Sequence, residues 1–545
     1  MSSPLSRPLR AALGGLTALG LLAAAGCGNP DAPDGAGAAT GIVLADAYED
    51  STLNPIAGYS ETGYSKIYDG LVRPAPYQPG VLPAIEPALA AQLPEPSADA
   101  REWTVNLRTG VTFHDGSTFD ADDVVATYRA VLDPVSGSPL AGSFEMLQAV
   151  DKVDATTVRF TLKYPYAPFD RRLMLGIVPA ESVATPGPAD ASPLGEKPIG
   201  TGAYKLESWR KGSEMVLTAN PDHWGGEPAV KKLTVVIAAD DNTRTQRTGA
   251  GEFDGAWLPP KLAATFADRD GFSVVAHPSA DFRAVSLPTA HPVTGDPAIR
   301  LALNHAVDRQ AMVDNILAGY GKPAYTPIPD SLGTFHNPQA TFAFDQARAG
   351  QILDAAGWVP GPDGIRVKDG QRAAFTLMYF PSETLRRDLS LAFTSDAKKI
   401  GIEVNLEGVD RPQFRPRIPQ DAGLLGGGDN PYDPDTQVYA TLHSSYAQYD
   451  ANNPFRNPGA YRNEAVDAAL DAGRRSVDPA ERTRAYQDMQ AELIKAPSNV
   501  MLAYLDHTYV MKDGDWTGTR PVLEPHSHGV SWGPWWNLRD WKPGR

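Results

Sequence analysis

Cysteine is almost absent from this chain, because one cysteine, Cys27, occurs among 545 residues. A single thiol excludes an internal disulfide and any zinc or iron–sulfur site that needs several cysteines. Basic residues are also in the minority, with 49 Lys and Arg against 65 Asp and Glu and a net charge of −16. A nucleic-acid-binding protein needs a basic face to neutralise phosphates, so we expect no nucleic-acid partner.

Long apolar runs are missing as well, apart from one near the N-terminus. Residues 11–25 are small and apolar, follow Arg7 and Arg10, and fall short of the ~20 residues that a membrane helix needs. The run ends in LAAAGC, which resembles the lipobox of bacterial lipoproteins. We therefore predict a signal peptide over 1–26, a lipid on Cys27 and a flexible tether over 27–40. An ordinary secretory signal with a chance cysteine is the alternative.

Strand and helix patterns follow one another irregularly along the remaining chain. Apolar and polar residues alternate around Trp103 and around Phe160, which predicts half-buried strands. Apolar residues at helical spacing run from Asp296 to Gly319, and further helices are predicted over 385–400 and 479–495. This mixture of elements is typical of α/β lobes.

Catalytic signatures are few. Residues 529–533 match the pattern G-x-S-x-G around Ser531, but a hydrolase needs a histidine later in the chain and none follows. His526 and His528 can hold a metal, together with His443, although a solvated turn is the simpler interpretation. We therefore expect no catalytic residue, no cofactor and no metal. A secreted serine hydrolase is kept as the alternative of another class.

One long stretch, LRTGVTFHDGSTFDADDV at 107–124, joins a strand, a tight turn and a helix. Asp120 can start that helix by accepting a hydrogen bond from the amide of Asp123. The stretch resembles the signature of the bacterial extracellular solute-binding proteins of family five, which include the dipeptide, oligopeptide and nickel receptors of ABC importers. Further resemblances to the family occur, in order, at 52–55, 67–71, 199–206, 220–226, 251–254, 299–319 and 355–358.

The resemblance implies an α/β, two-lobed, periplasmic-binding-protein-like (type II) fold with an extra subdomain inserted in the first lobe. Two strands near 282–287 and 500–506 are expected to cross between the lobes. The expected boundaries are 41–72, 199–287 and 505–545 for the first lobe, 73–198 for the inserted subdomain and 288–504 for the second lobe.

In the dipeptide-binding members of the family, an aspartate in a glycine-rich loop of the second lobe binds the ammonium group of the peptide. The resemblance makes Asp429 the candidate for this role, with Asn430 and Tyr432 beside it. Asp433 and Asp435, in the same loop, are residue types that often start turns. The Pro-Tyr pair at 431–432 resembles the nickel-receptor branch more than the dipeptide branch.

Four more residues are candidates for contact with a ligand, with ordinary packing as the alternative for each. Tyr59 and Tyr64 follow the opening motif, where the family places residues that face the ligand. Trp257 follows a turn expected at the edge of the cleft. Arg283 lies on an expected hinge strand and can pair with a carboxylate.

We therefore predict a monomeric lipoprotein, anchored through Cys27 to the outer face of the cell membrane or held in the periplasm. It would capture a short peptide and deliver it to the permease subunits of an ABC importer. A receptor for nickel, another metal chelate or an oligosaccharide remains open on the same fold. A signalling receptor or a peptide chaperone also remains open.

Overall fold

The structure is a computed structural model, and it describes residues 41–451, 453–514 and 516–544. The predicted signal peptide, the lipid site Cys27 and the tether to residue 40 lie outside the described residues. All described residues belong to one compact unit, Ala39–Arg545. No helix in this described part is long and apolar enough to cross a membrane.

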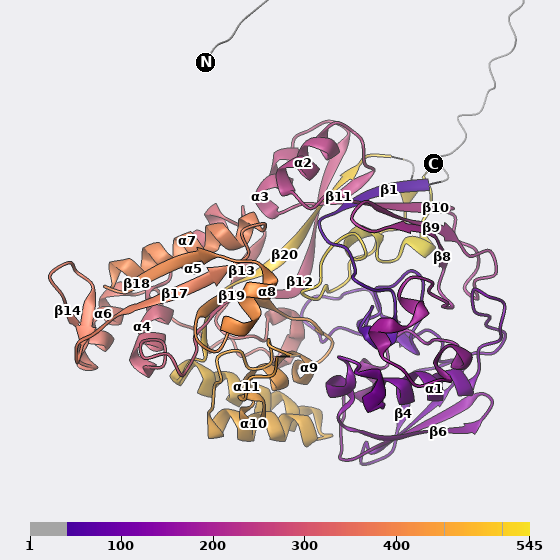
Figure 1. Cartoon of the computed structure of the whole chain (residues 1–545), viewed down its shortest axis with the longest axis horizontal. Coiled ribbons are helices and arrows are strands. Elements are labelled where there is room, and N and C mark those ends of the chain that lie inside the picture. The colour runs from indigo at the N-terminus through magenta and orange to yellow at the C-terminus, as the bar shows by residue number, and fades with distance from the viewer. Residues whose placement is uncertain (1–40, 452, 515, 545) are drawn as a thin grey trace, which may run out of the picture. The chain divides into compact units, whose positions relative to one another are not determined.

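One mixed sheet dominates the described chain and continues from one lobe into the other (Figure 1). Its strands follow the order β18-β17-β19-β12-β20-β11-β1-β10-β9-β8, and β13 (Gly321–Pro323) pairs with β20. Lobe I contributes β1 (Gly41–Asp46), β8 (Tyr204–Arg210), β9 (Glu214–Ala219), β10 (Lys232–Ile237) and β11 (Gly255–Trp257). Lobe II contributes β17 (Ala374–Tyr379), β18 (Glu403–Gly408) and β19 (Ala422–Gly427).

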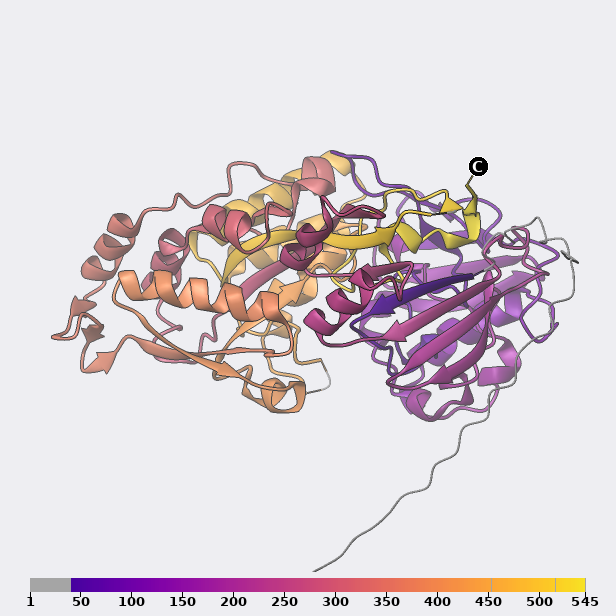
Figure 2. The same ribbon diagram turned by 90° about the horizontal axis from the view of Figure 1, so that it is seen from above.

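Two long strands connect these parts of the sheet, and we call them the hinge strands. They are β12 (Phe272–Ser286) and β20 (Asn499–Lys512), which pair antiparallel along most of their length (Figure 2). The register shifts between Pro278 and Phe282, and again after Arg283, which marks irregularities of the β-bulge type. Both crossing strands expected from the sequence lie within this pair.

Lobe II also contains helices, most of which begin at an Asp or Asn cap. They include α6 (Gln346–Ala355), α7 (Thr384–Lys399), α9 (Pro434–Leu442), α10 (Glu464–Arg475) and α11 (Pro479–Lys495). The predictions of helices over 385–400 and 479–495 are confirmed within one residue. The single helix expected over 296–319 is wrong. The chain forms α4 (Pro297–Ala306) and α5 (Arg309–Asn315), because Asp308 caps a new helix through its bond to the Ala311 amide.

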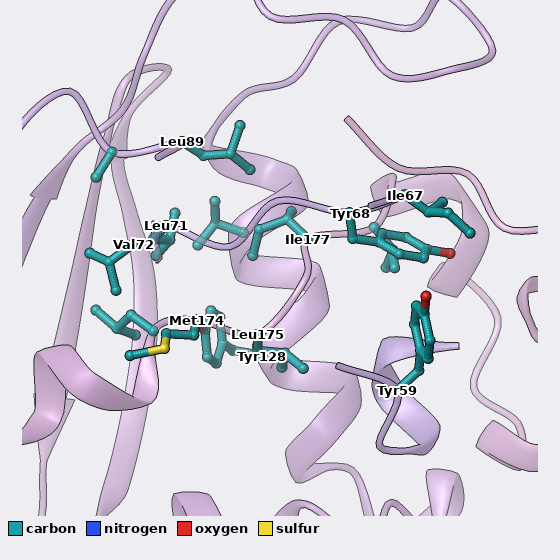
Figure 3. Packing of buried hydrophobic residues seen from close by; sticks show 14 of the residues in the cluster. Tyr59, Ile67, Tyr68, Leu71, Val72, Leu89, Tyr128, Met174, Leu175 and Ile177 are labelled. Atoms are coloured by element: carbon teal, nitrogen blue, oxygen red, sulfur yellow. The ribbon is translucent and has the colours of Figure 1, made fainter. Parts of the chain in front are cut away.

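The segment expected as the inserted subdomain contains a separate antiparallel sheet in the order β4-β5-β7-β6. Its strands are β4 (Glu95–Pro96), β5 (Glu102–Asn106), β6 (Leu147–Asp154) and β7 (Thr157–Leu162). Helix α1 (Ala121–Leu132) begins with a capping box, in which the Asp120 amide donates to the Asp123 carboxylate. Figure 3 shows Tyr128 of α1 packed in the buried cluster with Leu175 and Ile177.

Candidate functional site

A cavity of about 480 Å³ lies where the hinge strands pass between the lobes. This volume is typical of a site for a small ligand. The Thr384 hydroxyl of lobe II donates to the Asp241 carboxylate of lobe I at 3.0 Å, so the two walls touch beside the cavity. Lobe I lines it with Tyr48, Trp257, Pro259, Pro260 and His528, lobe II with residues 380–385 and 409–411, and the hinge strands with Asp281, Arg283 and residues 505–508.

Asp281 is the centre of a buried charge network on β12. It is fully buried and pairs with the Arg283 guanidinium, which is 2% exposed. His526 Nδ1 lies 2.6 Å from Asp281 Oδ1, and His507 Nε2 of β20 lies 3.1 Å from Asp281 Oδ2. Burial by itself raises the pKa of the Asp281 carboxyl, but Arg283 and His526 hold that pKa well below its usual range. Asp281 is therefore a carboxylate at neutral pH.

His507 joins this network to a second buried acid, Glu524. The Nδ1 atom of His507 lies 2.8 Å from Glu524 Oε2, so the imidazole bridges two carboxylates. Burial lowers the pKa of His507, but the hydrogen bonds to Asp281 and Glu524 raise it to about 9. His507 is therefore an imidazolium at neutral pH, and it ties both hinge strands to the C-terminal segment.

His528 behaves in the opposite way, although its ring centre lies 4.9 Å from that of His507. Its Nδ1 donates to the His526 carbonyl at 2.7 Å, which leaves Nε2 as the free nitrogen of the ring. Burial and the charge of His507 hold the pKa of His528 well below its usual value. Ligand atoms of Asp281, His507 and His528 all lie within 4.8 Å of one another, a group that can hold a metal ion once the His507 imidazolium gives up a proton.

A second cavity, of about 270 Å³, adjoins the first and shares Tyr48, Glu383, Arg411 and His528 with it. Carboxylates at the end of β1 and just after it line its lobe I side, and two arginines and Glu383 of lobe II line the other. The acids are Asp46, Glu49 and Asp50, the arginines are Arg386 and Arg411, and the aromatic walls are Tyr48, Tyr64 and Trp532. The two cavities together form a cleft in which lobe I presents acids, whereas lobe II presents Arg386 and Arg411 together with the acids Glu383 and Asp410.

The residues expected to contact a ligand are divided among several places. Arg283 and Trp257 line the 480 Å³ cavity, and Tyr64 lines the 270 Å³ cavity. Tyr59 is 7% exposed and packs with Tyr64. It also packs with Tyr68, as Figure 3 shows. Asp50 and Arg411 were not singled out, because no local pattern marks them.

Asp429 is exposed and lines a third cavity, of about 340 Å³, together with Phe282 and Ala284. Phe282 and Arg283 are neighbours on a strand and point to opposite faces, so this cavity lies on the other side of β12 from Arg283. Asn430 is 6% exposed, and Tyr432, at 1%, is buried with its hydroxyl near the Leu523 carbonyl. The structure therefore does not place Asp429 and Arg283 in one cavity.

Ser531 lacks the surroundings of a hydrolase nucleophile. Residues 529–532 form a turn that precedes the short 3-10 helix Gly533–Trp535, where such an enzyme has a sharp turn from a strand into a helix. The Ser531 carbonyl accepts a hydrogen bond from Lys66 Nζ at 3.0 Å, which ties this turn to lobe I. The turn therefore has a structural role.

Comparison with known proteins places the chain in a family. The sequence model of "Bacterial extracellular solute-binding proteins, family 5 Middle" matches residues 84–449. The chain is 46% identical over 498 residues to Protein XP55 of Streptomyces lividans, covering 91% of this chain and 89% of that protein. It is 27% identical over 426 residues to the oligopeptide-binding protein AppA of Bacillus subtilis, covering 75% and 77%. The chain belongs to the bacterial extracellular solute-binding proteins of family 5.

A solved structure agrees with the fold. NikZ from Campylobacter jejuni, in complex with Ni(L-His), superposes with a TM-score of 0.83 at 26% identity, covering 92% of this chain and 99% of that one. The two-lobed α/β fold of the periplasmic binding proteins, expected from the sequence, is therefore confirmed. The family consists of receptors that bind solutes outside the cytoplasm.

Proposed function

We propose that this protein is the substrate-binding lipoprotein of an ABC importer, and that it captures short peptides between its lobes. The observation that carries the proposal is the charged cleft, in which carboxylates of lobe I face arginines of lobe II. A peptide has an ammonium and a carboxylate, and each needs a partner of opposite charge when it leaves water. The name of the relative AppA, an oligopeptide-binding protein, supports the same ligand class.

The arrangement of the cleft suits a receptor that closes on its ligand. A ligand shifts an equilibrium between open and closed lobes only when it binds the closed state more tightly. A peptide that reaches both walls meets this condition, since part of its contacts form only on closure. The closed form would then dock on the permease, without covalent chemistry. Arg283, Trp257 and Tyr64 are candidate contacts in this cleft. Asp429, Asn430, Tyr432 and Tyr59 remain candidates outside it.

The anchor is the other part of the proposal. Cleavage before Cys27 would leave a lipidated N-terminus and a tether to residue 40, holding a monomeric receptor at the outer face of the membrane. A receptor held there can pass its ligand to permease subunits in the same membrane.

A metal chelate is the second candidate ligand, and one observation favours it. Asp281, His507 and His528 bring three ligand atoms within 4.8 Å in the wall of the cleft. The relative NikZ was solved with Ni(L-His). A chelate with its own carboxylates would also meet the arginines of lobe II.

Native mass spectrometry of the purified protein tests both candidates, because it reveals a co-purified ligand by its mass. A peptide, and a melting temperature that rises when that peptide is added back, is the expected result. A tightly held, stoichiometric metal found by elemental analysis would favour the chelate instead. Turnover of an ester or peptide substrate that disappears in Ser531→Ala would contradict a receptor function.

A further inference from the structure

Three acids, Asp46, Glu49 and Asp50, line the 270 Å³ cavity, and Asp50 differs from the other two in the hydrogen bonds of its carboxylate. Asp46 accepts hydrogen bonds from the amides of Val530 and Tyr48, at 2.8 and 3.2 Å. Glu49 accepts from the indole of Trp209 and from the amide of Gly212, both at 2.8 Å. Both of these carboxylates therefore hold the fold of lobe I together.

The Asp50 carboxylate is bound through one oxygen, Oδ1, which accepts from the Tyr64 hydroxyl at 3.0 Å. Its charged neighbours, Asp46 and Glu49, are acids that repel its negative charge. Burial raises the pKa of the Asp50 carboxyl to about 6, so this group gains from a positive partner more than a solvated aspartate does. Asp50 lines the 270 Å³ cavity, where a ligand can supply that partner.

The walls around Asp50 also suit a small cation. Tyr64 and Trp532 line the cavity with their ring centres 6.0 Å apart, and Tyr48 adds a third aromatic side chain. Trp532 is 1% exposed, and its indole nitrogen has no hydrogen-bond partner. An ammonium group near a carboxylate and aromatic faces is held by charge and by the negative faces of the rings.

The opposite wall of the same cavity carries two arginines and one acid, Glu383. Arg386 pairs with Glu383 of lobe II, whereas Arg411, at the start of α8 (Arg411–Phe414), is exposed with its guanidinium over the Phe380 ring at 5.1 Å. Arg411 lines both cavities of the cleft. A ligand with an ammonium at lobe I and a carboxylate at lobe II would bridge the two walls and favour closure.

We infer that Asp50 binds the primary ammonium group of the ligand, in the aromatic pocket of Tyr64 and Trp532, while Arg411 attracts its carboxylate. This inference rests on the proposed peptide-binding function and specifies the end of the cleft that receives the N-terminus. It places that end at lobe I, away from Asp429, which lines the cavity on the other face of β12.

The test uses two defined pools of tri- to pentapeptides, one with free amino termini and one acetylated at the N-terminus. The purified protein is mixed with both pools, and native mass spectrometry identifies the bound peptides. Affinity for one selected free peptide is then measured by calorimetry for the wild type, Asp50→Asn, Asp50→Glu and Asp429→Asn. Melting curves establish that each variant is folded.

We expect the wild type to select peptides with free amino termini. Asp50→Asn should weaken binding of the selected peptide about 10- to 100-fold, the value of a charge-assisted hydrogen bond, while Asp50→Glu retains most of the affinity. Asp429→Asn compares the two candidate acids and should lose less affinity than Asp50→Asn. Equal binding of free and acetylated peptides, unchanged affinity in Asp50→Asn, or a loss confined to Asp429→Asn would overturn the inference. If the wild type binds neither pool, the proposed function itself fails, and the role of Asp50 fails with it.

Discussion

Asp281 and His507 lie on opposite hinge strands, and His507 Nε2 is 3.1 Å from Asp281 Oδ2. This contact joins β12 and β20 by a charged hydrogen bond at the wall of the cleft, in addition to the ladder of the sheet. Two residues beside this contact, Arg283 and His528, are candidates for contact with a ligand, because both line the cavity. The buried network therefore sets the position of side chains that a ligand would meet.

Removing the charge of Asp281 should destabilise the protein. In Asp281→Asn the Arg283 guanidinium and the His507 imidazolium lose their shared acid while still buried, so we expect the free energy of unfolding to fall by about 3 kcal/mol. Chemical denaturation measures this change. The matched control is Asp330→Asn, which breaks the ion pair between Asp330 and Lys322. The side chain of Lys322 is 62% exposed and that of Asp330 is 56% exposed. That control should cost less than about 1 kcal/mol, and an equal effect in both variants would contradict the importance of the buried network.

His507 should make stability depend on alkaline pH. Its pKa is about 9 in the folded protein and about 6.5 when unfolded, so its stabilisation is complete below pH 6.5 and is lost as the pH rises to 9. Lys66, whose pKa burial lowers to about 7, changes stability in the opposite direction over the same range. The measured quantity is therefore the difference in unfolding free energy between the wild type and His507→Gln. This difference should shrink by up to about 3 kcal/mol as the pH rises from 6.5 to 9. A difference that stays constant from pH 6.5 to 9 would argue against an imidazolium.

Asp50 should make peptide binding depend on acidic pH. With a pKa of about 6 in the free protein, the carboxylate loses its charge as the pH falls, so affinity for a free amino terminus should drop about tenfold between pH 7 and pH 5. Other charged or titratable groups face the same cavity, namely Asp46, Tyr48, Glu49, Tyr64, Glu383, Arg386, Arg411, His526 and His528. Asp50→Asn separates their effects, because calorimetry on that variant should give a much flatter pH profile.

Gly426 on β19 should tolerate no side chain. A Cβ there would overlap the imidazole of His526 and approach Arg283 Nη1 to 2.9 Å, so Gly426→Ala should displace His526 from Asp281. We expect a loss of about 1–3 kcal/mol in unfolding free energy and a weaker ligand affinity. Gly187→Ala is the control, because its Cβ would meet no atom within 4 Å. Unchanged denaturation and binding in Gly426→Ala would show that His526 can move freely.

Cys27 should decide where the protein is found in the cell. Cys27→Ser removes the thiol that would carry the lipid, so the protein should move from the membrane fraction to the soluble extracytoplasmic fraction, with ligand affinity unchanged. Fractionation and immunoblotting measure the distribution. A variant that stays in the membrane fraction would argue for another means of attachment.

Several elements follow from local sequence alone. The alternation around Trp103 and Phe160 predicted strands, and β5 and β7 cover those residues with Trp103 and Phe160 buried. A helix was predicted over 479–495, and α11 covers those residues, with Asp478 as its cap. Such signals succeed because a cap and an apolar period act within a few residues. The break between α4 and α5 was missed, because the apolar stripe continues across it while Asp308 starts a new helix.

The sequence by itself determined the class of fold, the family and the absence of disulfide chemistry, since these depend on motifs and residue types that can be read in order. Only the tertiary structure decided which side chains share a cavity. Arg283 pairs with Asp281, and its Nη1 lies 3.3 Å from His526 Nδ1, 243 residues away in the chain, whereas Asp429 lines a cavity behind the hinge strand. The physical reason is that adjacent strand residues point to opposite faces, and a cleft forms only where the two lobes meet.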